Sequence, residues 1–241
     1  MNGGQPAAVM THGFPGTPSE MRPLAQALHD QGWTTRGILL PGLGPEIEQA
    51  TERSHSDWLN AVKSAQAELQ QQGHRPVILI GNSTGAALSL QVAAEKAVDA
   101  LILFAPFNRL ADSNIRLAWP LIRLMKQVKP FRVIPLDFEN EEVREGIHNF
   151  FPDANLDDPE VQEGIRNAPI PLRVIDQVVT AGRKGFQAAS QVRVPMVIFQ
   201  GVHDPVALPA DTDRLIARLP QAPRLVKLEG EHNLLDPTLP F

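Results

Sequence analysis

Short apolar runs alternate with longer amphipathic segments along this chain, and the alternation limits the folds that it can adopt. Short apolar runs that are each followed by glycine, proline or a polar turn predict buried strands, and the segments between them predict crossover helices. The pattern therefore predicts an α/β fold with a mostly parallel central sheet flanked by helices. The runs are residues 7–11, 34–40, 77–80, 100–105, 196–200 and 224–228.

The first helix is expected to begin with a capping box. Thr17 would be the N-cap, Pro18 the first helical residue, and Glu20 the acidic residue whose side chain returns to the cap. Gly32 would end this helix. Further helices, indicated by apolar residues at helical spacing or by a start after a turn, are expected at residues 57–72, 84–96 and 210–219.

The stretch from residue 107 to residue 190 breaks the alternation. It is rich in proline and phenylalanine, and residues 117–128 have the spacing of an amphipathic helix. A long insertion between two strands of such a sheet usually forms a lid over an active site. We therefore expect a core domain of residues 1–106 and 191–241 and a cap domain of residues 107–190.

Composition and charge exclude several classes of protein. The 241 residues suit one large domain with an insertion, and the absence of cysteine excludes disulfides, thiolate metal sites and cysteine catalysis. A formal net charge of -5 gives no electrostatic reason to bind nucleic acid or an anionic membrane. No apolar stretch is long enough for membrane insertion, and no signal peptide is visible, so a cytoplasmic location is expected.

The pentapeptide Gly-Asn-Ser-Thr-Gly at residues 81–85 fits the pattern G-x-S-x-G between a predicted strand and a predicted helix. A sharp strand-to-helix turn exposes the serine above the sheet, and it needs glycines where a Cβ would collide with neighbouring backbone. The start of the helix also supplies free backbone N–H groups. The pattern predicts Ser83 as a nucleophile, against the alternative of an ordinary glycine-rich turn.

A serine hydroxyl needs a base within hydrogen-bond reach, and a third group must hold that base. With such a turn the chain order is serine, acid, histidine, and the histidine follows the last strand. His232 meets this condition and is the expected general base. His203 lies before the last strand, and His12 precedes the serine. The remaining histidines are expected in helices or polar loops: His29, His55, His74 and His148.

The acid is expected after the strand at residues 196–200. Asp204 lies there, directly before a proline, where an aspartate that only stabilises a turn is the alternative. Asp176 and Asp236 are the reserve candidates. Glycines in residues 11–16, after the first strand, let backbone N–H groups approach an oxyanion closely.

The order and spacing of these motifs resemble the α/β-hydrolase superfamily, and most of all its small bacterial carboxylesterase and monoacylglycerol lipase group. That group carries a helical cap inserted after the strand that follows the nucleophile helix. The resemblance covers nearly all of the chain outside the expected cap. It rests on residues 11–14, 41–44, 81–85, 201–204 and 230–232.

The resemblance implies a catalytic triad of Ser83, Asp204 and His232, with an oxyanion hole formed by the backbone N–H groups of Phe14 and Thr84. It also implies hydrolysis of short- to medium-chain acyl esters or monoacylglycerols through an acyl-enzyme, without a metal or cofactor. Thr84 stands where such esterases often have a bulkier apolar residue, so a different acyl pocket is expected. The oligomeric state is not predicted.

Aromatic residues of the expected cap are candidates to line an acyl site, with a cap core as the alternative. A thioesterase, a C–C bond hydrolase and an acyltransferase use the same triad, and the motifs do not separate them from an esterase. A ligand-binding protein without catalysis is a further alternative, which a structure with His232 out of reach of Ser83 would favour. The aromatic candidates are Trp119, Phe150, Phe151 and Phe186.

Overall fold

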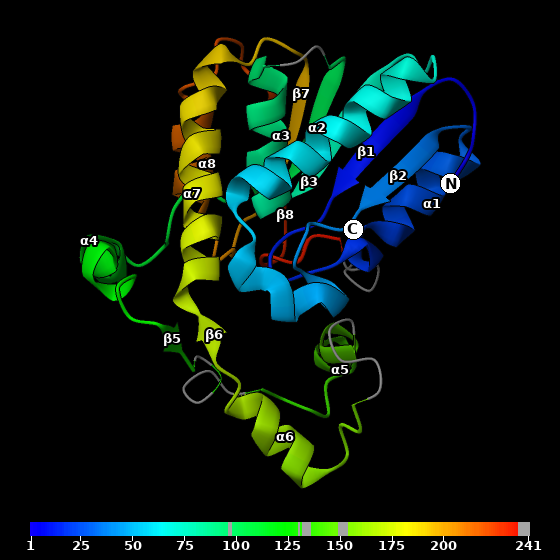
Figure 1. Ribbon diagram of the computed structural model, residues 1–241. Helices are drawn as coiled ribbons and strands as arrows, with labels where there is room; N and C mark the ends of the chain where they lie inside the picture. Colours follow the sequence, from blue (N-terminus) through cyan, green and yellow to red (C-terminus); the bar gives the residue numbers. More distant parts are fainter. Residues whose placement is uncertain (96–97, 130, 132–135, 149–153, 236–241) are drawn as a thin grey trace.

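A parallel six-stranded sheet forms the centre of the computed structural model, which describes residues 1–95, 98–129, 131, 136–148 and 154–235 (Figure 1). Each strand overlaps one of the six expected runs, so the predicted α/β class is confirmed. The strands are β1 (Ala7–Thr11), β2 (Thr34–Ile38), β3 (Val77–Asn82), β4 (Ala100–Phe104), β7 (Met196–Gly201) and β8 (Arg224–Leu228). They lie in the order β2-β1-β3-β4-β7-β8, and every pairing is parallel.

The central strands are buried, and mostly apolar, because both faces of the sheet are covered. Every residue of β1 and β3 is buried. Ala7 and Val9 contribute to one hydrophobic cluster, whereas Ala8 and Met10 contribute to a second, as alternation along a strand requires. Because all strands are parallel, their carboxyl ends lie at the same edge of the sheet, which is where the loops after β1, β3, β7 and β8 meet.

Helices cover both faces of this sheet (Figure 1). The cluster that contains Val9 also contains residues of α2 (His55–Gln71), α3 (Thr84–Glu95) and α7 (Leu172–Ala188). The opposite cluster contains residues of η1 (Pro18–Met21) and α1 (Arg22–Asp30). The remaining elements of this part are η2 (Gly44–Glu52), η4 (Ala189–Gln191) and α8 (Pro209–Ile216). Among the described residues, no helix combines the length and apolar character that crossing a membrane requires.

Thr17 is the N-cap and Pro18 the first helical residue, as expected, but the complete capping box expected there is wrong. The Thr17 hydroxyl accepts a hydrogen bond from the N–H of Ser19, but the Glu20 carboxylate does not return to the cap. It accepts hydrogen bonds from distant residues, and the segment begins as a 3-10 helix before α1. A capping box does form at α2, where the Asp57 carboxylate accepts a hydrogen bond from the Ser54 N–H and these contacts lower the pKa of Asp57.

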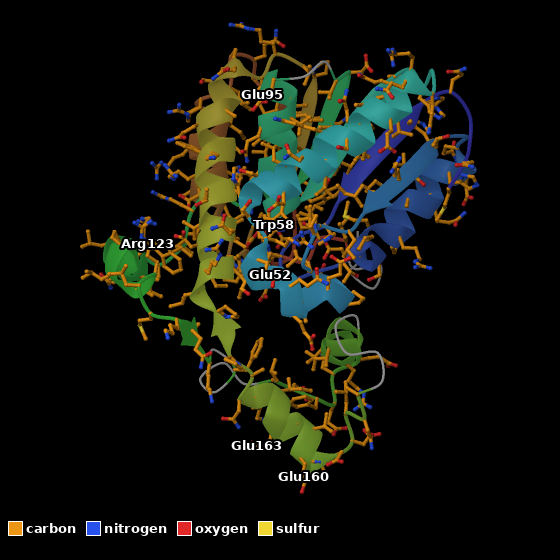
Figure 2. The ribbon with its side chains drawn as sticks, viewed as in Figure 1. Glu52, Trp58, Glu95, Arg123, Glu160 and Glu163 are labelled. Atoms are coloured by element: carbon orange, nitrogen blue, oxygen red, sulfur yellow. The ribbon has the colours of Figure 1, made fainter. Side chains whose placement is uncertain are left out.

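The segment after β4 leaves the sheet and forms small elements beyond its carboxyl edge (Figure 1). These are α4 (Ser113–Ile122), β5 (Gln127–Val128), α5 (Glu141–His148), α6 (Pro159–Arg166) and β6 (Ile170–Pro171), with β5 and β6 paired antiparallel. Arg123, at the end of α4, and Glu160 and Glu163, on α6, lie at the periphery of the molecule (Figure 2).

The helix expected at residues 117–128 is displaced toward the N-terminus. The Asp112 carboxylate accepts hydrogen bonds from two N–H groups of the first turn and so starts α4 at Ser113. The helix ends two residues after Pro120, which has no N–H to donate. Leu117 is 84% and Leu121 73% exposed, so the apolar side of α4 is not buried within the described chain.

Helix α7 differs from the other elements of residues 107–190 because it packs along α3. Its Gln177 side chain accepts a hydrogen bond from the N–H of His55, and its Ala181 carbonyl accepts one from Gln91 of α3. A Cβ on Gly185 would lie 2.6 Å from the Ala87 carbonyl oxygen. We therefore propose that α7 belongs with the helices of the core and that the cap comprises residues 107–171.

His12 joins the loop after β1 to the end of the neighbouring strand β2. Its side chain is completely buried. The Nδ1 atom lies 2.7 Å from the carbonyl oxygen of Gly13, and the Nε2 atom lies 3.0 Å from the backbone nitrogen of Leu40. Because a carbonyl can only accept and an N–H can only donate, Nδ1 carries the proton and the ring is neutral.

We predict that His12 makes the protein less stable in acid. Burial lowers the pKa of His12 from 6.5 to about 4, so between these values the unfolded chain binds a proton that the folded chain excludes. The contribution of His12 to the free energy of unfolding is complete above pH 6.5, and it falls by about 3 kcal/mol as the pH falls to about 4. Urea unfolding across this range measures the loss.

The His12→Gln variant serves as the comparison, because its side-chain oxygen can still accept from the Leu40 N–H but does not titrate. Burial also lowers the pKa of His55, but His55 remains in both proteins, so the difference between their pH curves isolates His12. We expect a shallower curve for the variant. Parallel curves would contradict the assignment of a buried neutral ring.

A second prediction concerns the contact between α3 and α7. Gly185→Ala is expected to lower the free energy of unfolding by about 1–3 kcal/mol, because the added methyl overlaps the backbone of Ala87. Gly164→Ala in α6 is the matched control, since no atom lies within 4 Å of its added Cβ. Alanine there is expected to raise stability by about 0.5–1 kcal/mol through helix propensity. Equal effects of both variants in urea unfolding would show that α7 does not pack as described.

Candidate active site

Ser83 occupies the turn between β3 and α3 in a backbone conformation that is rare for a residue with a side chain. Its φ is 51°, in the left-handed region. A Cβ on Gly81 would lie 2.5 Å from the backbone nitrogen of Ala86, and one on Gly85 would overlap the carbonyl oxygen of Thr11. Glycine is therefore required on both sides of Ser83, as the sequence pattern predicts.

The imidazole of His232 lies between Ser83 and Asp204. Its Nδ1 atom is 2.8 Å from Asp204 Oδ2, and its Nε2 atom is 3.0 Å from Ser83 Oγ. An ionised carboxylate can only accept, so Nδ1 carries the proton, and Nε2 is left to accept the hydrogen of the serine hydroxyl. Ser83 follows β3, Asp204 follows β7 and His232 follows β8, and the structure brings the three residues together with His232 in the middle.

Both oxygens of Asp204 have defined partners. Oδ1 accepts hydrogen bonds of 2.8 Å from the N–H groups of Val206 and Ala207, whereas Oδ2 faces His232. The aspartate therefore stabilises its turn and holds the histidine at once. The side chain of Asp204 is fully buried, and these donors compensate for the loss of water around the charge.

Gln200, the penultimate residue of β7, is an additional contact of Asp204 that the motif analysis does not include. Its Nε2 atom lies 3.5 Å from Asp204 Oδ2 and 3.0 Å from the carbonyl oxygens of Gly201 and Ala207. Its Oε1 atom accepts a hydrogen bond from the Thr212 hydroxyl. Gln200 thus ties the aspartate loop to α8. A polar residue in an otherwise apolar strand is the sequence signal that could have indicated it.

The expected oxyanion donors lie on two loops that touch each other. A Cβ on Gly13 would be 3.1 Å from the Cβ of Ser83, so the loop after β1 passes directly over the nucleophile. The N–H groups of Phe14 and Thr84 donate no hydrogen bond to any other described residue, whereas the N–H of Gly13 donates to Glu20. The N–H groups of Phe14 and Thr84 are therefore free to bind an oxyanion.

Glu20 lies at the site although its sequence context indicates a helix cap. Its Oε1 atom is 2.7 Å from the backbone nitrogen of Gly13 and 3.0 Å from Asn82 Nδ2. Burial raises the pKa of Glu20, and the hydrogen bonds together with the nearby charge of His232 act to lower it. No sequence signal separates this role from capping, because Asn82 is distant along the chain.

Neither His203, the histidine set aside in favour of His232, nor the reserve acid Asp176 contacts Ser83 or His232. His203 is largely exposed and lies 3.4 Å from Glu229. Asp176, on α7, accepts a hydrogen bond from the Trp119 indole and lies 4.0 Å from Arg123. Asp236 lies outside the described residues.

The cap aromatics are not gathered around Ser83 in the described part of the chain. Trp119 and Phe186 line a cavity of about 310 Å³ between α4, α7 and α8, and none of the triad residues lines it. Phe150 and Phe151 lie outside the described residues. Contact of these four residues with an acyl group stays a prediction. The described residues contain no cluster of three or more histidine, cysteine, aspartate or glutamate side chains suited to a metal ion.

Two Bacillus enzymes are similar to this chain in sequence. The chain is 33% identical over 90 residues to a thermostable monoacylglycerol lipase of Bacillus sp. strain H-257, a match that covers 37% of this chain and 36% of that protein. It is 28% identical over 90 residues to a carboxylesterase of Bacillus subtilis strain 168, covering 37% of each chain. The matched segment thus spans about a third of the length of these relatives.

Similarity in structure extends over nearly the whole chain. The crystal structure of the monoacylglycerol lipase of Paleococcus ferrophilus superposes with a TM-score of 0.69 at 16% identity, covering 98% of this chain and 90% of that one. This likeness shows the α/β-hydrolase fold. The family described as serine aminopeptidase, S33 matches residues 5–235. The chain therefore belongs to this serine hydrolase family of the α/β-hydrolase fold.

Proposed function

We propose that the protein hydrolyses carboxylic esters through an acyl-enzyme on Ser83. The observation that carries the proposal is the placement of one imidazole within hydrogen-bond distance of both a serine hydroxyl and a buried carboxylate. This is the arrangement that nucleophilic acyl transfer requires. The names of the two Bacillus relatives, a monoacylglycerol lipase and a carboxylesterase, support an ester as the substrate.

The proposed reaction follows from the positions of the atoms. His232 Nε2 takes the proton of Ser83 while Oγ attacks the ester carbonyl carbon, and the carbonyl oxygen becomes an oxyanion between the Phe14 and Thr84 N–H groups. His232 then gives the proton to the departing alcohol as the carbon–oxygen bond breaks. Water attacks the acyl-enzyme by the same route and releases the acid. Asp204 stabilises the imidazolium in both steps.

Other reactions remain open on the same groups. A thioester, a carbon–carbon bond beside a carbonyl, or an acyl acceptor other than water would use the same nucleophile and base. The family description adds the amide bond of an aminoacyl group to these. The identity of the leaving group therefore has to be measured.

A third prediction compares the wild type and Ser83→Ala on p-nitrophenyl esters from acetate to palmitate. We expect turnover by the wild type and a loss of about 10⁴-fold or more in Ser83→Ala, because removal of a triad nucleophile leaves only binding and oxyanion stabilisation. The acyl chain at which kcat/KM is greatest reports the length of the acyl pocket.

Acyl thioesters, aminoacyl p-nitroanilides and C–C bond hydrolase substrates, assayed with the same two proteins, identify the alternatives. Turnover of any of these that depends on Ser83, without turnover of esters, would overturn the ester proposal and retain the nucleophile. A folded wild type that acts on none of them would favour a ligand-binding role.

A fourth prediction uses the two roles of Asp204. In Asp204→Asn the amide oxygen can still accept from the Val206 and Ala207 N–H groups, but the amide nitrogen faces His232. The imidazole then has to accept at Nδ1 and carry its proton on Nε2, where it cannot take the serine proton. We expect kcat to fall by about 10³–10⁴-fold.

The stability of the aspartate variants separates the two roles. Asp204→Asn is expected to unfold close to the wild type, whereas Asp204→Ala, which leaves both N–H groups without an acceptor, is expected to be less stable by about 1–3 kcal/mol. Activity of Asp204→Asn within about tenfold of the wild type would mean that another group holds His232.

A further inference from the structure

Glu20 is an ionisable residue that approaches the site and has no part in the proton transfers described above. It belongs to η1, directly before α1, and its side chain turns toward the carboxyl edge of the sheet instead of toward its own helix. One atom, Oε1, accepts hydrogen bonds from the Gly13 backbone nitrogen and from Asn82 Nδ2. The carboxylate therefore connects two segments that are far apart in sequence.

Each partner directly precedes a residue of the proposed machinery. Gly13 precedes Phe14, which provides one oxyanion donor, and Asn82 precedes the nucleophile Ser83. The other donor, Thr84, follows Ser83. A single oxygen atom of Glu20 thus links the loop that carries one donor to the turn that carries the nucleophile and the second donor.

The link to Asn82 also determines the orientation of that side chain. Asn82 is buried, and its Oδ1 atom has no hydrogen-bond partner among the described residues. Its bond from Nδ2 to Glu20 is therefore the polar contact that holds the amide. Loss of the carboxylate would leave both the amide and the Gly13 N–H without a partner in a buried site, which favours movement of the two segments.

We propose that Glu20 is a positioning residue that holds the Phe14 and Thr84 N–H groups at the spacing needed to bind the oxyanion over Ser83. This inference rests on the proposed acyl transfer. It assigns to Glu20 no contact with the substrate: the residue acts through Gly13 and Asn82.

The hydrogen bonds of Glu20 explain its proposed role better than its charge does. The transition state develops a positive imidazolium and a negative oxyanion together. A carboxylate beside both attracts the first and repels the second, so the two effects offset each other. The hydrogen bonds to the two loops do not cancel in this way, and a displacement of about 1 Å of oriented groups costs as much as about 100-fold in rate.

Two substitutions separate the hydrogen bonds from the charge. Glu20→Gln keeps an amide oxygen that can accept from both Gly13 and Asn82, and it removes the charge. Glu20→Ala removes both. We expect Glu20→Ala to lower kcat by about 10- to 100-fold with KM nearly unchanged, and Glu20→Gln to recover most of that loss.

Asp99→Ala is the matched control. The Asp99 carboxylate also accepts a backbone hydrogen bond, 2.6 Å from the nitrogen of Val77, but at the opposite end of β3 from Ser83. We expect this variant to lose thermal stability without a specific loss of kcat. It therefore measures what a merely structural carboxylate contributes.

The rate at which an alkyl p-nitrophenyl phosphonate phosphonylates Ser83, with release of p-nitrophenolate, gives a readout that does not depend on the natural substrate. Its tetrahedral product places an oxygen in the oxyanion hole, so misplaced donors slow the reaction. We expect the wild type to react fastest, Glu20→Gln more slowly and Glu20→Ala most slowly, and we expect the same order for kcat on esters. Thermal unfolding of each variant confirms that the folded fraction is the same.

The outcomes distinguish this inference from the proposed function. If the wild type reacts with the phosphonate but hydrolyses no ester, the ester proposal fails, and the order of phosphonate rates still tests Glu20. Equal rates for all three proteins would overturn the role of Glu20 while leaving the triad in place. Equal impairment of Glu20→Gln and Glu20→Ala, or a loss that only follows unfolding, would also overturn it.

Discussion

Between β3 and α3 the chain turns at Ser83 with a φ of 51°, and the backbone of this turn touches the loop after β1. A non-glycine residue in this region costs about 1–3 kcal/mol, so the surrounding packing has to maintain it. Strand β3 lies inside the sheet between β1 and β4 and is buried along its whole length, which provides that packing. The serine hydroxyl is thereby presented at the edge where the other loops of the site converge.

The other residues of the site are held around this turn by hydrogen bonds between carboxylates and N–H groups. Asp204 is buried as an anion and is stabilised by two backbone N–H groups, so it can hold the protonated nitrogen of His232. Glu20 accepts from the N–H of Gly13, whereas the neighbouring N–H of Phe14 donates to no described residue. The contacts between Asp204 and His232, and between Glu20 and Gly13, join different loops, so the site depends on the sheet that brings these loops together.

The cap contributes differently from the core. Helix α4 has no buried residue, and its leucines face outward. Trp119 and Phe186 contact a cavity outside the triad, whereas α7 is held against α3 by close backbone approach at Gly185. This contrast supports the proposed division of the segment between β4 and β7 into a cap of residues 107–171 and a helix, α7, that belongs to the core.

Much of the core could be predicted from the sequence because its signals are local. A buried parallel strand needs a continuous apolar run, and a strained turn needs glycine on either side of Ser83; both requirements are visible along the chain. The order of Ser83, Asp204 and His232 follows from the positions of these residues after their strands. The distances that unite them, across as many as 149 positions, come from the packed sheet.

Where prediction failed, a contact between distant residues replaced a local preference. The pattern at Thr17 and Glu20 favours a helix cap, but the folded chain offers the Glu20 carboxylate the N–H of Gly13 and the amide of Asn82, which is 62 positions away. The spacing at residues 117–128 indicates an amphipathic helix and says nothing of what covers its apolar side. The sequence by itself determined the strands, the strained turn and the reactive residue types, because these depend on each segment's own backbone and polarity. Only the tertiary structure decided which polar groups meet, because each of those partners is supplied by a different loop at the edge of the sheet.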